Sequence, residues 1–265
     1  MKVLKFKLSG KTAFFKKPDV NTYLYFTYGN IHKVALLGLF GSVLGYGGYN
    51  QMKLTEELSE KKKKDEVKIK FPEFYEKLKN LKVSIAPSNE KGFIPKKVQC
   101  FNNSVGYASK EQGGNLIVKE QWLENPSWDI YVLIENEESQ KIADNLINHK
   151  SVYSPYLGKN DHYADISNVE LLDTESILDG SNVNKINCLF TKESFKIVLD
   201  DEDEYEEDDD DIYEETFKYE EKLPISLNED TNMYELKSFL YTNIKVCSDS
   251  KCSVYKIKNN NIVFY

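Results

Sequence analysis

Lysine and phenylalanine side chains are interleaved near the start of the chain, and together they could bind RNA. Lys11, Lys16 and Lys17 surround Phe14 and Phe15. Ammonium groups neutralise phosphates and aromatic rings stack on unpaired bases, a combination typical of proteins that bind single-stranded nucleic acid. The alternative interpretation is a solvated basic loop whose two phenylalanines belong to the hydrophobic core.

Histidine is the side chain that most often acts as a general base, and the chain has three, His32, His149 and His162. Cleavage of RNA without a metal needs such a base and a cation that stabilises the charged phosphate in the transition state. His149 follows an expected helix, where capping the helix end is the simpler role. His32, which is next to Lys33, is the best candidate for catalysis, and Tyr46 is the second candidate residue of that site.

The four cysteines do not indicate a metal site. Cys100 and Cys188 are isolated, and Cys247 and Cys252 flank a polar segment that is typical of a turn between two strands. A structural zinc site typically takes four ligands at regular, close spacings. We therefore expect reduced thiols in a cytoplasmic protein, with neither a metal nor another cofactor.

A strand and a glycine-striped helix position the basic aromatic segment. Residues 1–9 alternate lysine with apolar side chains, the pattern of a half-buried strand. The apolar stretch 34–46 carries Gly38, Gly41 and Gly45 at spacings of three and four, which share one helix face. Each interior glycine costs about 0.5–1 kcal/mol relative to alanine. The stripe therefore indicates close packing against another element or close approach of a ligand. At this length, 34–46 cannot span a bilayer, which takes about 20 residues.

The remaining pattern predicts several strands and two helices. The strands are expected at 82–86, 97–103, 116–122, 129–134 and 164–172, and the helices within 71–81 and at 137–148. Residues 53–70 are expected to be a lysine-rich linker. The strands between residues 97 and 122 form a hairpin with a polar tip. Without this hairpin the order is βα, ββ, αβ, which predicts an α+β, ferredoxin-like or RRM fold for residues 1–175. Residues 176–265 indicate a small β-rich C-terminal appendage that ends in a hairpin.

Charge is distributed unevenly along the chain. Residues 1–119 hold 22 lysines and 10 acidic residues, whereas residues 120–265 hold 13 lysines and 33 acidic residues. The basic half suits a polyanionic partner. All 35 basic residues are lysine, so RNA contacts would use ammonium groups, backbone N–H groups, amides and aromatic stacking. The acidic insert, residues 200–211, indicates a solvated loop, and a cation site or a nucleic-acid mimic are the alternatives.

The order of these segments resembles the Cas-five family of CRISPR-associated proteins, RAMP-superfamily subunits of the type I Cascade complex. The resemblance covers residues 1–173 and includes the first strand, the basic aromatic loop and the glycine-striped helix. It also includes residues 122–131 and the segment Tyr153–Ala164, which contains Pro-Tyr-Leu-Gly-Lys-Asn. The segment Leu223–Leu227 suggests the type I-B branch. In this family the hairpin between residues 97 and 122 is a thumb that lies over the guide RNA.

The resemblance implies a non-catalytic Cascade subunit that binds and caps the repeat-derived 5′ handle of the CRISPR guide RNA. Such a subunit bridges the backbone subunit and the large subunit in antiviral defence. Its partners are then the guide RNA, these subunits, the processing nuclease and, through the complex, target DNA, but no membrane. The expected RNA-binding residues are Lys11, Phe15, Lys16, Lys17, His32, Lys33, Gly45, Tyr46, Gly47, Gly48, Tyr49, Asn102, Asn103, Lys110, Lys119 and Lys159.

Two other functions remain open from the sequence. The first is a metal-independent endoribonuclease that matures the guide-RNA precursor, with His32 and Tyr46 in its site. In type I-C relatives a lysine–histidine pair near the thumb contributes to that cleavage, whereas the matching strand here, residues 96–101, has no histidine. The second is a single-stranded RNA-binding module unrelated to CRISPR.

Within the Pro-Tyr-Leu-Gly-Lys-Asn segment we expect a structural turn. Lys159 in this segment and His162 just after it are further candidates for RNA contacts.

Overall fold

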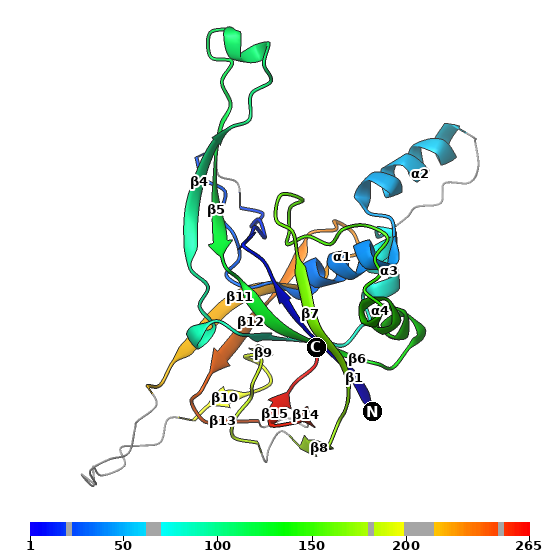
Figure 1. Cartoon of the computed structure of the whole chain (residues 1–265), viewed down its shortest axis with the longest axis vertical. Helices are drawn as coiled ribbons and strands as arrows, with labels where there is room; N and C mark the ends of the chain where they lie inside the picture. Colours follow the sequence, from blue (N-terminus) through cyan, green and yellow to red (C-terminus); the bar gives the residue numbers. More distant parts are fainter. Residues whose placement is uncertain (20–22, 62–69, 180–182, 199–214, 249–251) are drawn as a thin grey trace.

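A computed structural model describes residues 1–19, 23–61, 70–179, 183–198, 215–248 and 252–265, and it has a mixed α+β fold with several antiparallel sheets (Figure 1). The central sheet contains β1 (Lys2–Ser9), β3 (Val83–Pro87), β6 (Ser127–Leu133) and β7 (Asp165–Asp173). Their order is β3-β6-β1-β7, and every pair is antiparallel. With α1 (Lys33–Leu44) and α4 (Glu137–Ile147), the chain order is β1-α1-β3-β6-α4-β7, as the hydrophobic pattern predicted.

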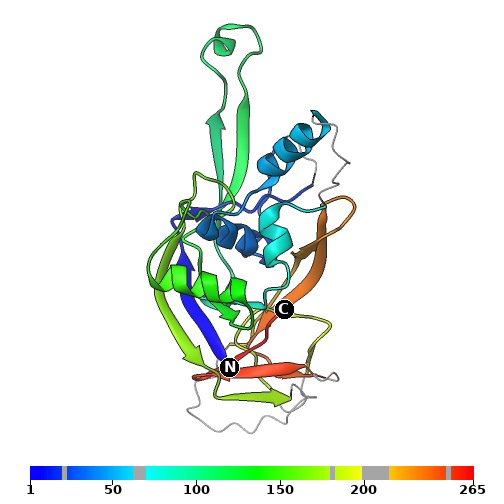
Figure 2. The same cartoon turned by 90° about the vertical axis from the view of Figure 1, so that its right-hand side faces the viewer.

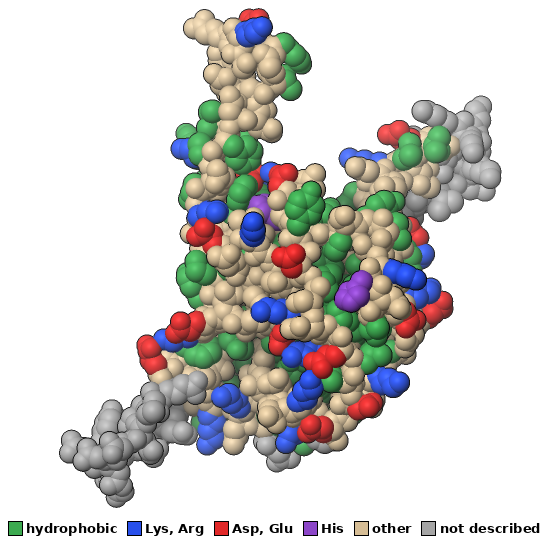
Figure 3. Space-filling view, viewed as in Figure 1, with side chains coloured by type: hydrophobic (Ala, Val, Ile, Leu, Met, Phe, Trp, Pro, Cys, Tyr) green, Lys and Arg blue, Asp and Glu red, His purple; other side chains and the backbone are tan. Residues whose placement is uncertain are grey.

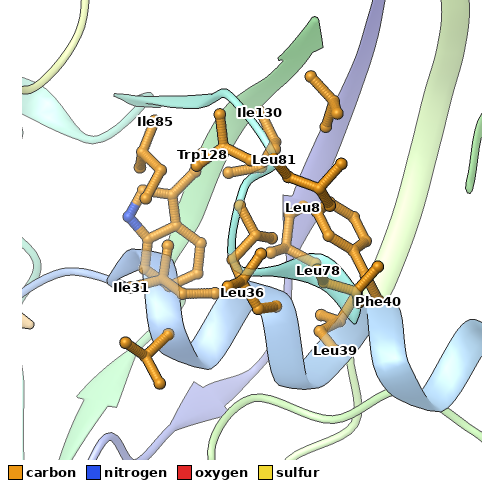
Figure 4. Packing of buried hydrophobic residues seen from close by; sticks show 14 of the residues in the cluster. Leu8, Ile31, Leu36, Leu39, Phe40, Leu78, Leu81, Ile85, Trp128 and Ile130 are labelled. Atoms are coloured by element: carbon orange, nitrogen blue, oxygen red, sulfur yellow. The ribbon is translucent and has the colours of Figure 1, made fainter. Parts of the chain in front are cut away.

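Helices cover one face of the central sheet. Alternate residues of β1 (Leu4, Phe6 and Leu8) are buried there, because side chains along a strand alternate between its two faces. They pack with α1, α4 and the short α3 (Glu73–Leu78) in a core that Figure 4 shows from close by around Trp128 and Phe40. Burial of each such side chain contributes about 1.5–3 kcal/mol, so this core fixes α1 firmly on the sheet.

The C-terminal third covers the other face and also enters the first core. Its strands are β8 (Ser176–Asp179), β9 (Phe190–Thr191), β10 (Lys196–Ile197), β11 (Lys218–Leu227), β12 (Tyr234–Thr242), β13 (Val246–Cys247), β14 (Ser253–Ile257) and β15 (Asn260–Ile262). Val3 and Tyr131 of the central sheet share a second core with Phe190 and Val254. Leu223 of β11 lies in the first core beside the helices. The region expected as an appendage is therefore integrated into both cores, and the β11–β12 hairpin is an element that the sequence did not indicate.

The hairpin predicted between residues 97 and 122 is present and projects from the body of the molecule (Figures 1 and 2). We call residues 96–124 the thumb hairpin. Its strands are β4 (Lys96–Asn102) and β5 (Ile117–Glu124), and β2 (Thr12–Ala13) pairs with the base of β5. A short 3₁₀ helix, η2 (Ala108–Lys110), lies at the tip, and a second, η1 (Glu90–Gly92), precedes β4.

The linker predicted at residues 53–70 is wrong over its first part. A helix, α2 (Tyr49–Lys61), projects from the body (Figures 1 and 2), and Leu54 and Leu58 are exposed on it. Residues 62–69 and the acidic insert at 200–211 lie outside the described residues. Within the described ranges, no helix is both long and apolar enough to cross a membrane.

The charge asymmetry of the sequence is balanced by contacts in the folded chain. Lysines of the first half pair with acids of the second half, as in Lys17 with Glu221, Lys91 with Glu215 and Lys82 with Glu135. On the face drawn in Figure 3, basic and acidic side chains are interspersed. The net positive charge of residues 1–119 therefore does not correspond to a continuous basic surface on this face.

Candidate nucleic-acid interface

A groove of about 650 Å³ runs along α1 and brings together segments from the whole chain. We call it the aromatic groove. Its lining residues are Phe14, Phe15, Lys16, His32, Ala35, Gly38, Leu39, Ser42, Tyr46, Gly48, Tyr49, Asn50, Gln51, Phe74, Tyr153, Tyr156, Gly158 and Tyr234. Of the expected RNA-binding residues, the groove unites Phe15, Lys16, His32, Tyr46, Gly48 and Tyr49.

Tyrosines from three separate elements form the walls of the groove. Tyr153 and Tyr156, in the loop after α4, have 59% and 45% of their surface exposed. Tyr49, at the start of α2, and Tyr234, at the start of β12, are 44% and 38% exposed. Large aromatic side chains left in solvent cost hydrophobic free energy, so their convergence on one cavity indicates a ligand surface.

The end of α1 holds the loop after α4 in place. The backbone N–H groups of Val152 and Tyr153 donate to the carbonyls of Val43 and Ser42, each at 3.0 Å. These carbonyls belong to the last turn of α1, where helix geometry leaves them without intrahelical partners. Gly45 ends the helix in the left-handed conformation, with φ of 78°, which glycine adopts without strain. The helix end therefore fixes one tyrosine wall.

Two glycines allow the loop after α4 to pack against the basic aromatic segment. A Cβ on Gly158 would lie 2.1 Å from the carbonyl oxygen of Phe14, and Gly158 has a positive φ of 87°. The adjacent Leu157 accepts a hydrogen bond from the Phe14 N–H at 3.1 Å. A Cβ on Gly10 would lie 2.8 Å from the Leu157 side chain. Glycine is therefore needed at position 158, because the backbone of the loop lies directly against the backbone of Phe14.

The glycine stripe has two different roles. A Cβ on Gly41 would lie 2.6 Å from Cβ of Phe74, so Gly41 permits close packing of α3 on α1. A Cβ on Gly38 would have the Phe74 ring as its nearest neighbour, at 3.9 Å, and Gly38 lines the groove. The packing expectation is confirmed at Gly41, where the partner is a helix and its aromatic side chain, and the approach of a ligand at Gly38 stays a prediction.

The backbone N–H groups expected to bind phosphate are already used within the chain. The Tyr46 N–H donates to the Gly41 carbonyl at 2.9 Å, and the Gly47 N–H donates to Oε2 of Glu73 at 2.8 Å. The Gly48 N–H donates to Oε1 of Gln51 at 3.0 Å. A phosphate would have to displace a carboxylate or an amide, so these backbone N–H groups are not free to bind the phosphates of RNA.

His32 and Tyr46, the candidate catalytic residues, both line the groove. Nδ1 of His32 accepts a hydrogen bond from the Ala35 N–H at 3.2 Å, which caps α1. Burial lowers the pKa of His32 to about 3, so the ring is neutral. The Tyr46 hydroxyl donates to Oε2 of Glu138 at 2.5 Å, and burial followed by this hydrogen bond raises the pKa of Tyr46 to about 12. Both side chains are therefore uncharged near neutral pH.

Phe15 is a core residue under the groove. Its ring is 3% exposed and packs edge-on against His32 and Trp128, at centroid distances of 6.0 Å. Phe14 is buried in the same way. The two phenylalanines are therefore core residues, as the alternative interpretation of the sequence had it, and we correct their assignment as stacking platforms. Both side chains are at most 5% exposed, so they offer almost no surface to a base.

The lysines of the basic segment differ in their surroundings. Lys11 and Lys16 are exposed, and the Lys16 ammonium lies 3.9 Å from the centre of the Tyr25 ring. Lys17 lies 3.5 Å from Glu221 and is partly neutralised by it. Lys33 is half-buried, and burial lowers its pKa to about 8. Lys11 and Lys16 are thus the cations of this segment best suited to meet a phosphate.

Lys159 and His162 lie at the foot of the thumb hairpin and hold it to the body. Lys159 is 3.3 Å from the buried carboxylate of Glu120, which also accepts a hydrogen bond from the Trp122 indole at 2.8 Å. His162 is almost fully buried, hydrogen-bonded through Nδ1 to Thr12 at 2.6 Å. Its ring meets Trp122 edge-on at 4.6 Å. The expectation that these two residues face RNA is corrected: the contacts of both are structural.

The remaining expected residues are exposed on the thumb hairpin. They are Asn102, Asn103, Lys110 and Lys119. The tip is less polar than expected, because Val105, Tyr107 and Leu116 are exposed beside them. Such apolar side chains in solvent are typical of surfaces that contact a partner.

Sequence reasoning missed three of the four exposed tyrosines of the groove. Tyr153 and Tyr156 occur in the Pro-Tyr-Leu-Gly-Lys-Asn region, where the polar Lys159 and His162 were the expected RNA contacts instead. Tyr234 comes from the unpredicted β11–β12 hairpin. The available signal was the high density of tyrosine between residues 153 and 163.

Within the described residues, no cluster of three His, Cys, Asp or Glu side chains could hold a metal.

Comparisons with known proteins give similarity at the level of structure. No family model matches the sequence, and no curated protein matches it. Among solved structures, a chain of a "CRISPR RNA-guided surveillance complex" has a TM-score of 0.49 at 12% identity, over 94% of this chain and 92% of that chain. A CRISPR protein from Archaeoglobus fulgidus has a TM-score of 0.45 at 11% identity, over 99% and 98% of the two chains. A structure described as a Cas protein has a TM-score of 0.41 at 10% identity, over 91% and 94%.

Proposed function

We propose that this chain is an RNA-binding subunit of a CRISPR RNA-guided surveillance complex of the Cascade type. In this role it caps the repeat-derived 5′ handle of the guide RNA and catalyses no reaction. We infer that residues 1–175 form the ferredoxin-like unit of a RAMP protein of the Cas-five family, of the type I-B branch. The thumb hairpin then contacts the backbone subunit, the body contacts the large subunit and the processing nuclease, and target DNA is reached through the complex.

One observation carries this proposal. The segments whose order resembles the family, namely the basic aromatic loop, the glycine-striped helix and the Tyr153–Ala164 segment, converge on one groove. Exposed tyrosines and Lys16 line this groove, and Lys11 is exposed on the same basic segment. Aromatic faces next to lysines are the arrangement that binds an unpaired RNA segment without arginine.

The alternative function, a metal-independent endoribonuclease, has one observation in its favour. His32 and Tyr46 share the groove. Their chemistry argues against it, because Nδ1 of His32 already accepts a backbone hydrogen bond and the Tyr46 hydroxyl is bound to Glu138. A general base needs a free nitrogen within reach of the attacking hydroxyl, and a pKa near the working pH. The low pKa of His32, about 3, makes it a weak base.

The test is to purify the tagged protein from its native host and to sequence both ends of the bound RNA. The proposed function predicts RNAs that share one repeat-derived 5′ end, together with several co-purifying subunits. Scattered RNA ends, or the absence of RNA, would contradict it. Incubating the purified chain with repeat RNA in EDTA tests the nuclease alternative, which requires a cut that disappears in the H32N and Y46F variants.

A further inference from the structure

We propose that the aromatic groove is a nucleobase site: one or two unpaired bases stack on its tyrosines, while the phosphates are bound by Lys11 and by Lys16, the lysine of the lining. This inference rests on the proposed function for the identity of the polymer as RNA. The ligand of the groove is then an unpaired base, bound by the tyrosines, whereas the phosphates of the RNA are bound by lysines.

The electrostatic character of the lining favours a base over a phosphate. Within the described part of the chain, the groove is lined by one lysine, Lys16, and by no acidic side chain. The other polar groups are neutral, from Ser42, Asn50, Gln51 and the tyrosines. A phosphate requires cations or free N–H groups, and the N–H groups of Gly47 and Gly48 are occupied. A base needs flat apolar faces and neutral hydrogen-bonding groups, which this lining supplies.

The size and openness of the groove also fit this ligand. Its volume, about 650 Å³, lies within the range of about 300–1,000 Å³ that is typical of small-molecule sites. Tyr153 and Tyr156 come from the loop after α4, Tyr49 comes from α2 and Tyr234 comes from β12. Rings from different elements that are each partly exposed can receive a base between them, as paired stacking platforms do.

His32, which lines the groove and is 3% exposed, has a fixed tautomer. Its Nδ1 accepts the Ala35 N–H, so the proton of the neutral ring is assigned to Nε2. Tyr234 and Tyr28 pack edge-on against the ring at 5.3 and 5.2 Å and hold its orientation. A donor that cannot switch to an acceptor favours base edges with an acceptor at the matching position. The groove is therefore expected to discriminate between bases as well as to stack them.

The experiment measures binding of the full-length chain to three octamers by fluorescence anisotropy: r(A)8, r(U)8 and an abasic ribose-phosphate octamer of equal charge. The variants are Y156L and Y49L, which remove a stacking face from each wall. Y163L is the matched control, because Tyr163 is 72% exposed, pairs with Tyr156 in the same loop and is not part of the lining. Thermal unfolding checks that each variant is folded.

We expect each groove variant to weaken binding of the base-containing octamers about tenfold, with an unchanged dependence on salt. Binding of the abasic octamer, and all binding by Y163L, should equal that of the wild type. A K11Q/K16Q variant should instead lower the salt dependence for all three octamers. Equal losses on the base-containing and abasic octamers, or no loss in the groove variants, would overturn the proposal.

A second variant protects the test against misfolding of the tyrosine variants. Gly38 lines the groove, and a Cβ there has open space up to the Phe74 ring at 3.9 Å, so G38L fills the groove from the helix side. It should reproduce the loss of binding to r(A)8 and r(U)8, with binding of the abasic octamer unchanged. Two outcomes separate this proposal from the proposed function. If host-purified RNA shares no 5′ end but the groove variants lose binding only to the base-containing octamers, the proposed function fails and the base site stands. If a guide RNA with one 5′ end is bound but the groove variants show no such difference between base-containing and abasic octamers, the base site fails and the proposed function stands.

Discussion

At the scale of single residues, the two interior glycines of α1 have different surroundings although they belong to one sequence motif. Gly41 lies against Cβ of Phe74, and no side chain fits there without moving α3. Gly38, three residues earlier, faces the groove and has room for a methyl group. The spacing predicted that both share a face, but which neighbour covers each glycine depends on the position of α3.

Alanine at these two positions should change stability in opposite directions. G38A should raise the free energy of unfolding by about 0.5–1 kcal/mol, because alanine is the better helix former and its Cβ meets no close atom. G41A should lower it by about 1–3 kcal/mol, because its Cβ overlaps Phe74. Urea denaturation of the three proteins measures both changes. Destabilisation by G38A equal to that by G41A would contradict the separate roles.

His32 should make stability depend on pH. Its pKa is about 3 in the folded chain and 6.5 for the ordinary side chain, so the unfolded chain binds the extra proton between these values. The stability that His32 contributes is therefore complete above pH 6.5 and is lost as the pH falls toward 3. From pH 7 to pH 5 this loss is about 2 kcal/mol.

The variant H32N isolates this contribution, because asparagine is also a good N-cap and does not titrate. Chemical denaturation at pH 7 and pH 5 should show a loss about 2 kcal/mol larger in the wild type than in H32N. The same pH dependence in both proteins would mean that His32 is accessible to protons in the folded state.

At the scale of elements, the sequence predicted the regular core and missed what lies outside it. The alternation in β1 and the period of α4 follow from one buried face each, so the order β1-α1-β3-β6-α4-β7 could be predicted directly. The helix α2 was missed because its lysine and glutamate residues resemble a linker, and the β11–β12 hairpin was missed because Pro224 interrupts its pattern. The tyrosine walls depend on these missed elements and on a loop, which periodicity does not describe.

The loop after α4 should depend on Gly158 through a specific contact. G158A should destabilise the fold because its Cβ overlaps the Phe14 carbonyl and because φ is 87°. Gly113, in the thumb hairpin, has a similar φ of 77° but no atom within 4 Å of an added Cβ. G113A therefore measures the backbone cost alone, and G158A should exceed it by about 1–3 kcal/mol. Thermal unfolding and RNA binding of both variants provide the comparison, and equal effects would exclude the contact with Phe14 as the cause.

At the scale of the whole molecule, the two halves of the chain fold as one unit. Leu223 and Phe239 of the acidic half lie in the core formed by β1 and the helices. The carboxylate of Glu221 accepts hydrogen bonds from the Gly29 N–H, at 2.9 and 3.0 Å, and from the Tyr219 hydroxyl at 2.7 Å. Gly29 lies three residues before His32, so β11 supports the segment that leads into the aromatic groove.

Removing the charge of Glu221 tests this coupling. E221Q should lower the free energy of unfolding by about 1–3 kcal/mol, because an amide supplies one acceptor oxygen where the carboxylate supplies two to partly buried donors. The neighbouring Glu220 pairs with Lys192 and Lys218 on the surface, so E220Q should change stability by at most about 1 kcal/mol. Denaturation of both variants, with proteolysis at residues 23–30 as a local probe, separates the two positions. If E220Q and E221Q unfold alike and neither exposes that segment to protease, the β11 contact does not hold the entry to the groove, and the two halves cooperate through their hydrophobic cores alone.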